Sequence, residues 1–175
     1  PPPKLFRSPQ ILIDRLHESI DAGDYNLYVP PEGAADCLAE IVEYENAWLP
    51  AGARPYTLNN VMLVPGGIQA FSLVLSELVA KDDQIVVPTP SYFSLAALSE
   101  LRARTVAGPA YLAHNFQVDE VRAALAAAER VRLLWFCQPN NPTGLYLPTK
   151  TLQEVIELAK HYDAYVVLDE SCDNY

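Results

Sequence analysis

The residues best suited to chemistry stand in turns that directly follow short apolar runs. The first such turn is Gly66-Gly67-Ile68-Gln69, after the run 61–64. Two glycines let the backbone approach a ligand closely, and the first amides of the following helix point outward, which suits a phosphate. The spacing is neither G-x-G-x-x-G nor G-x-x-x-x-G-K-[ST], so dinucleotide and nucleoside-triphosphate sites lose support. A plain tight turn is the alternative.

Three further turns add aromatic, amide and carboxylate groups. Tyr92 follows the second apolar run, where it is placed to stack on a planar ligand, although aromatic residues at a sheet edge usually only pack. Asn141 stands in the stiff polar loop 138–144, in which prolines flank two asparagines. Asp169 comes directly after the last apolar run. A buried carboxylate needs a cationic or N–H partner, from the protein or from a ligand, and we favour a ligand.

Helical and strand-like segments alternate along the chain and must position these turns. Helices are predicted at 9–22, from Leu38 to Trp48, from Phe71 to Leu78, and at 91–102, 118–129 and 151–162, and strands at 61–64, 85–87, 104–106, 131–136 and 165–168. Continuous apolar strands between amphipathic helices indicate an α/β fold with a mainly parallel sheet and helices on both faces. In such sheets ligands bind beyond the carboxyl ends of the strands, where the four turns stand.

The composition excludes several classes of function. Acidic residues outnumber basic ones by 22 to 12, the net charge is −10 and no basic stripe is present, so we expect no nucleic-acid partner. A hydrophobic share of 50% suffices for a buried core and is too high for a disordered chain. The longest apolar runs, such as Leu133–Cys137, are far too short to span a membrane.

Cys37, Cys137 and Cys172 are an odd number of cysteines at wide spacing, with no C-x-x-C pair and no histidine pair to complete a zinc site. We therefore expect no metal, and free thiols in a reducing cytoplasm. The proline-rich start lacks the pattern of a secretory signal. Because the chain stops soon after an apolar strand-like run, we expect it to be a piece of a longer protein.

Five motifs, in this order, resemble those of the fold-type I aminotransferases of class I/II, which depend on pyridoxal 5′-phosphate (PLP). The motifs are Tyr28-Val-Pro-Pro-Glu-Gly33, Gly66-Gly67-x-Gln69-Ala70, Pro90-x-Tyr92, Pro139-Asn140-Asn141-Pro142-Thr143-Gly144 and Asp169-Glu170. The resemblance runs from about residue 9 to the end of the chain. Its most specific part is the P-N-N-P-T-G loop with an aspartate downstream, since the glycine pair alone is common.

The resemblance implies a domain organisation and a set of ring contacts. Residues 1–55 would form an N-terminal helical segment and loop, and 56–175 the first, incomplete part of a large PLP-binding domain. Asp169 resembles the carboxylate that keeps the pyridine nitrogen of PLP protonated. Asn141 resembles the amide that donates to the phenolic oxygen, with a cis bond to the following proline. Tyr92 resembles the aromatic residue that stacks over the ring.

The resemblance also implies how the phosphate is held. Gly67, Ile68 and Gln69 resemble the backbone cradle for the phosphate group. Tyr28 resembles the tyrosine that reaches the phosphate of the neighbouring subunit, which implies a homodimer with shared active sites.

The implied reaction is transamination between an amino acid and a 2-oxo acid. The Schiff-base lysine of the family lies in a later segment, and none of Lys4, Lys81, Lys150 and Lys160 occupies its position. We therefore expect no catalytic residue in this chain, and an enzyme only together with a C-terminal part. Cys172 stands where many members carry a tyrosine, and a thiol is a poorer donor. Elimination, decarboxylation or oxidation on the same fold, and a non-catalytic remnant, stay open.

Overall fold

A computed structural model of the chain describes residues 7–92, 104–110 and 116–172. The chain divides into two compact units, Pro1–Leu63 and Val64–Tyr175. The second unit contains the β-sheet and four of the five motifs singled out in the sequence.

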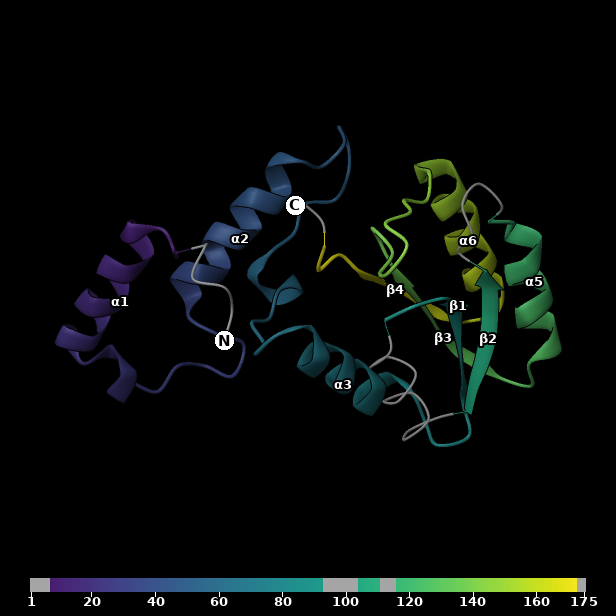
Figure 1. The fold of residues 1–175 in the computed structure, drawn as a ribbon, viewed down its shortest axis with the longest axis horizontal. Coiled ribbons are helices and arrows are strands. Elements are labelled where there is room, and N and C mark those ends of the chain that lie inside the picture. The colour runs from purple at the N-terminus through teal and green to yellow at the C-terminus, as the bar shows by residue number, and fades with distance from the viewer. Residues whose placement is uncertain (1–6, 93–103, 111–115, 173–175) are drawn as a thin grey trace. The chain divides into compact units, whose positions relative to one another are not determined.

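The sheet of the second unit is parallel throughout (Figure 1). Its strands lie in the order β2-β1-β3-β4, with the bounds β1 Gln84–Thr89, β2 Arg104–Ala110, β3 Val131–Cys137 and β4 Tyr165–Asp169. The predicted parallel sheet is therefore confirmed. Since all four strands run the same way, their carboxyl ends share one edge, here called the carboxyl edge, and their starts share the opposite amino edge.

Helices cover both faces of this sheet, as predicted (Figure 1). They are α3 Gly67–Leu78 on one face, and α5 Val118–Ala127 with α6 Thr149–His161 on the other. Alternation along the strands divides the core in two. Toward α3 point Ile85, Val87, Leu133 and Trp135, which pack with Phe71 and Leu75. Toward α5 and α6 point Val86, Leu134 and Phe136, which pack with Val121, Leu125, Val155 and Leu158.

Residues 61–64, predicted as a strand, are irregular, so that prediction is wrong. An apolar run becomes a strand only when another strand pairs with it, and the described residues provide no such neighbour. The Leu63 N–H donates instead to the Glu32 carbonyl at 2.8 Å. The predicted helix 91–102 falls almost wholly outside the described residues.

The first unit is helical. It contains α1 Gln10–Ala22, α2 Ala35–Ala47 and the short 3-10 helices η1 Asp24–Asn26 and η2 Leu58–Asn60, so both long helices predicted there are confirmed. The Asn46 side chain ties α2 to the following loop, since it accepts from the Tyr56 N–H at 2.8 Å and donates to the Tyr56 carbonyl at 3.1 Å. Over the described parts of both units, no helix is long and apolar enough to cross a membrane.

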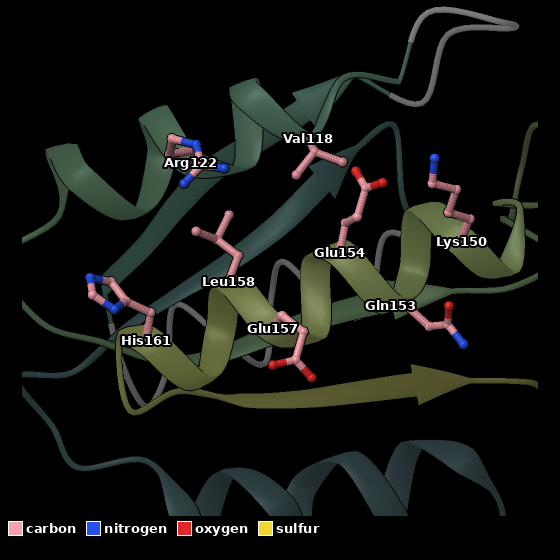
Figure 2. Close-up of a pocket in the computed structure, with 8 residues that line it drawn as sticks. All are labelled: Val118, Arg122, Lys150, Gln153, Glu154, Glu157, Leu158 and His161. Atoms are coloured by element: carbon pink, nitrogen blue, oxygen red, sulfur yellow. The ribbon is translucent and has the colours of Figure 1, made fainter.

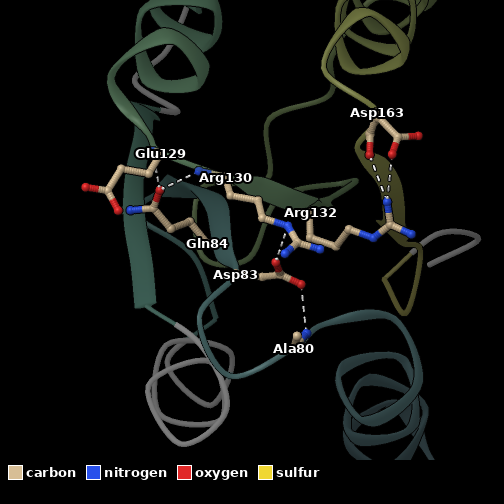
Figure 3. Close-up of polar contacts among 7 residues, drawn as sticks. All are labelled: Ala80, Asp83, Gln84, Glu129, Arg130, Arg132 and Asp163. Carbon is tan, nitrogen blue, oxygen red and sulfur yellow. Dashed lines mark hydrogen bonds and ion pairs between the residues drawn. The ribbon is translucent and has the colours of Figure 1, made fainter.

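Polar contacts at the amino edge hold the starts of the strands (Figure 3). Asp83, which is 2% exposed, accepts from the Ala80 N–H at 2.8 Å and forms an ion pair with Arg130 Nε at 2.9 Å. The next residue, Gln84, accepts through Oε1 from the N–H groups of Glu129 and Arg130 at 2.7 and 3.2 Å. These contacts join the start of β1 to the chain entering β3.

A second contact at this edge joins β3 to β4. Arg132 Nη1 lies 3.1 Å from both the carbonyl and the carboxylate Oδ2 of Asp163, and the guanidinium lies 4.7 Å from the centroid of the Tyr165 ring (Figure 3 draws the Asp163 contacts). Polar side chains thus join the start of β1 to that of β3, and the start of β3 to that of β4.

We predict that Asp83→Ala destabilises the protein by about 1 to 3 kcal/mol, because it removes the acceptor of the Ala80 N–H and the partner of Arg130. Most of the loss should come from the buried hydrogen bond, since Arg130 is largely exposed and exposed ion pairs contribute little. Urea unfolding measures the effect. The control is Asp82→Ala at the exposed neighbouring position, and equal unfolding midpoints for the two variants would contradict the prediction.

Candidate functional site at the carboxyl edge

The carboxyl edge gathers chemically active residues on the side of the sheet covered by α3. Asp169 follows Val167 by two residues in β4, so both side chains point to the same face. Val167 and Tyr92 both pack against the core cluster beneath α3. Cys137 is paired in register with Asp169 across β3 and β4, and it follows Trp135 of the same cluster by two residues.

The glycine turn opens α3 beside the end of β4. Gly66 has φ of 86°, in the left-handed region that favours glycine. A Cβ added at Gly67 would lie 3.3 Å from the Ser171 Oγ, so little room separates the turn from the loop after β4. The start of the helix and the end of the strand therefore belong to one site.

The first turn of α3 is open to an anion. It contains no acidic residue and no side-chain cap. The N–H groups of Gln69 and Ala70 donate back to the Gly66 carbonyl at 3.1 and 3.2 Å. The amides of Gly67 and Ile68 have no intrahelical acceptor, and both residues are exposed. Two free donors at the positive end of the helix dipole favour a negatively charged group.

In the part of the chain that the structure describes, the Asp169 carboxylate is held through one of its two oxygens. Its Oδ1 accepts from the Ser171 N–H at 3.1 Å and from the Ser171 hydroxyl at 2.6 Å. Within the described ranges, Oδ2 has no hydrogen-bond partner and no cation is paired with this carboxylate. Asp169 is half-buried. The arrangement leaves one oxygen of a fixed anion free to face a cationic ligand group.

The loop after β3 is folded on itself. The Asn140 N–H donates to the Leu145 carbonyl at 2.8 Å, and the Gly144 N–H donates to the Asn140 carbonyl at 2.7 Å. Asn141 is half-buried, and the predicted cis bond between Asn141 and Pro142 is confirmed. At the root of the loop, Gln138 is buried and accepts from the Leu147 N–H at 3.1 Å.

Cys137 lies at the centre of these groups as a neutral thiol. Its Sγ donates to the Pro139 carbonyl at 3.3 Å. Burial raises the pKa of Cys137 above its ordinary value, the Asn141 N–H partly opposes this shift, and negative charge on Asp169 and Cys172 reinforces it. Cys172 itself is exposed.

The structure thus brings six of the seven predicted site residues into one unit: Gly67, Ile68, Gln69, Tyr92, Asn141 and Asp169. Tyr28 belongs to the first unit, where its side chain is fully exposed. Sequence reasoning missed Ser171, Asn140 and the placement of Cys137 beside Asp169. Ser171 carried a usable signal, because a serine two residues after an aspartate often donates back to its carboxylate.

A hollow of about 740 Å³ lies away from this site, between α5 and α6 on the other face of the sheet (Figure 2). Basic and acidic side chains both line it, among them Arg122, Lys150, Glu154 and Glu157. This mixture of charges points to no particular ligand.

The fold and the carboxyl edge define an α/β protein with a parallel sheet, in which an uncapped helix start lies beside the end of a strand. Residues 6–171 match the family Aminotransferase class I and II, and the chain belongs to that family. The predicted resemblance and fold class are therefore confirmed.

Individual relatives agree with this assignment. A probable aspartate aminotransferase of Methanocaldococcus jannaschii is 26% identical over 171 residues, covering 96% of this chain and 44% of that protein. Histidinol-phosphate aminotransferase 2 of Archaeoglobus fulgidus is 30% identical and covers 83% of this chain and 43% of that protein. The solved structure of an alanine aminotransferase from Pyrococcus furiosus has a TM-score of 0.82 at 25% identity, and the match covers 94% of this chain and 41% of that one. The chain spans less than half the length of these relatives.

Pyridoxal 5′-phosphate is the cofactor on which this family depends. The residues at the carboxyl edge fit it. The first turn of α3 offers the Gly67 and Ile68 amides and no acidic group, which suits a phosphate. The free Oδ2 of Asp169 suits a protonated ring nitrogen, and the packed Tyr92 ring offers an aromatic surface.

We predict that Cys137 resists alkylation in the folded protein while the exposed Cys37 reacts, because only a thiolate is reactive and burial disfavours it. The pKa of Cys137 is raised in the folded state. The neutral thiol therefore contributes fully to stability below the pKa of the unfolded state, and this contribution is lost as the pH rises through the pKa of the folded state. Mass spectrometry of alkylated peptides at increasing pH measures the reactivity. Equal rates at both cysteines would contradict the prediction.

Proposed function

We propose that this chain forms the cofactor-binding portion of an aminotransferase that moves an amino group between an amino acid and a 2-oxo acid. Family membership supports the reaction class, and the names of the aspartate, histidinol-phosphate and alanine aminotransferases among its relatives support amino-acid substrates. The single observation that carries the proposal is the free Oδ2 of Asp169 beside the uncapped start of α3.

Asp169 would hold a proton on the ring nitrogen of the cofactor. When bound, pyridoxal 5′-phosphate supplies an electron sink for the carbon that carries the amino group. That sink is strongest while the ring nitrogen is protonated, and an anionic partner favours the protonated form. Ser171 fixes the Oδ1 oxygen with two hydrogen bonds, so the carboxylate cannot rotate freely and Oδ2 keeps its direction.

The other site residues would orient the cofactor. The backbone of Gly67, Ile68 and Gln69 would bind the phosphate, with the amides of the first two free to donate. Asn141 would donate to the phenolic oxygen, and Tyr92 would stack on the ring. The buried Cys137 thiol lies beside Asp169 on the neighbouring strand, where it stays neutral and adds no second negative charge next to the carboxylate.

We further propose that two copies of the whole protein form a homodimer, in which Tyr28 contacts the phosphate of the partner subunit. Tyr28 is fully exposed in its unit, and its neighbours Leu27 and Val29 are 69% and 61% exposed. Three consecutive exposed residues of this kind suit a subunit interface better than a solvated surface. The free cysteines fit a cytoplasmic location, and the named reactions of the relatives fit a role in amino-acid biosynthesis.

The first test is Asp169→Asn in the full-length protein. We predict that the amino-acid half-reaction slows by orders of magnitude and that cofactor binding weakens, because a neutral amide does not favour a protonated ring nitrogen. Rapid-mixing absorbance with a panel of amino acids measures both, and product analysis separates transamination from elimination and decarboxylation.

The matched control is Asp163→Asn at the amino edge, where the side chain is 99% exposed and φ is 52°, a value that asparagine tolerates. It removes the same charge from the other end of β4. Turnover by Asp169→Asn at the rate of this control would refute the assignment of Asp169.

The second test concerns the dimer. Tyr28→Phe removes one hydrogen bond to a charged phosphate, worth about 1.5 to 3 kcal/mol, so we predict about 10- to 150-fold weaker cofactor binding. Tyr25→Phe, at a neighbouring exposed tyrosine, should leave binding unchanged. Titration of the full-length protein with cofactor, together with its mass in solution, measures both points. A monomer that binds the cofactor tightly would exclude the shared site.

A further inference from the structure

Asn140 is a buried amide that links two turns of the carboxyl edge. It is 2% exposed. Its Nδ2 donates to the Pro90 carbonyl at 3.2 Å and to the Thr143 hydroxyl at 2.8 Å. The first contact crosses from the loop after β3 to the loop after β1, and the second stays within the loop after β3.

The orientation of this amide is fixed by chemistry. A proline carbonyl only accepts hydrogen bonds, so the Nδ2 group and not the Oδ1 must face Pro90. The Oδ1 is then buried with no hydrogen-bond partner within the described part of the chain. A buried acceptor without a partner opposes folding. The Asn140 side chain therefore stabilises the fold by less than two hydrogen bonds would on their own. Its main effect is to link the two loops.

Both loops carry a residue of the proposed cofactor site. Pro90 precedes Tyr92 by two residues, and Asn140 directly precedes Asn141. One side chain thus links the loop of the residue that would stack on the ring to the loop of the residue that would donate to its phenolic oxygen. β1 and β3 are adjacent in the sheet, but their direct pairing covers only Gln84 to Val86, so no ladder between these two strands joins their loops at this end. Each strand is paired further along with its other neighbour, β1 with β2 as far as Thr89 and β3 with β4 as far as Cys137.

We propose that Asn140 is a positioning residue of the cofactor site: by binding the Pro90 carbonyl it holds Tyr92 and Asn141 at the spacing that the ring requires. This inference rests on the proposed function. Asn140 acts through Tyr92 and Asn141 and does not itself touch the ring.

Gln84 provides a matched control at the opposite end of the same two strands. It is also a buried amide, 5% exposed, and its Oε1 joins β1 to the residues entering β3 by accepting from Glu129 and Arg130 (Figure 3). Replacing either amide removes two hydrogen bonds: both bonds of Gln84 join β1 to the residues entering β3, and one of the two bonds of Asn140 joins the loops at the other end of these strands. Only Asn140 adjoins the proposed site, so only its replacement should change how the cofactor is held.

The experiment compares Asn140→Ala, Gln84→Ala and Thr143→Val in the full-length protein. Three quantities are measured: cofactor affinity by titration, the visible circular dichroism of the bound cofactor, and the unfolding midpoint. We expect Asn140→Ala to weaken cofactor affinity about tenfold, which corresponds to the net free energy of one hydrogen bond, and to reduce the dichroism signal. Gln84→Ala should lower the unfolding midpoint by at least as much with unchanged dichroism. Thr143→Val keeps the Pro90 contact and should retain wild-type dichroism.

A second variant keeps the inference testable if alanine perturbs folding. Asn140→Asp preserves the side-chain volume and removes both donated bonds, so it should show the same loss of dichroism. Unchanged affinity and dichroism in both Asn140 variants, or equal changes in Gln84→Ala, would overturn the positioning role. Failure of the wild-type protein to bind the cofactor would instead refute the proposed function.

Discussion

The packing of Phe71 on Trp135 fixes where α3 begins relative to the sheet. The two rings meet edge to face with centroids 4.2 Å apart, and Phe71 is 1% exposed. Phe71 stands one helical turn after Gly67, so this contact places the first turn of α3 against the loop after β4. The distance between the free amides of α3 and the Asp169 carboxylate depends on it. The chemistry of the carboxyl edge is therefore set by an apolar contact.

The two edges of the sheet differ in how completely their polar groups are paired. At the amino edge Asp83, Gln84 and Arg132 each have a protein partner, although the buried Oδ1 of Asp83 is held by its ion pair with Arg130 and by no further hydrogen bond within the described residues. At the carboxyl edge, within the described residues, Asp169 Oδ2 and Asn140 Oδ1 have none. Unpaired polar groups lower the stability of a fold, and the free Oδ2 of Asp169 stands where a ligand at the carboxyl edge could pair with it.

Sequence order alone predicted the parallel sheet and the edge on which Gly67, Asn141 and Asp169 gather. Both depend only on the alternation of strands with helices, which is local information. The strand at 61–64 was wrong because strand formation depends on a partner elsewhere in space. Asn140 was overlooked because its importance comes from the Pro90 carbonyl, 50 residues earlier in the chain. The contacts of Ser171 with Asp169 are local and were predictable.

The placement of Asp169 by strand alternation restricts how the length of this chain can change in evolution. Successive side chains of β4 point to opposite faces, so inserting or deleting one residue within the strand would turn the carboxylate toward α5 and α6. The same change in the turn 162–164, before β4 begins, leaves the direction of Asp169 untouched. A change in chain length near Asp169 is therefore tolerated better in the turn before β4 than within the strand itself.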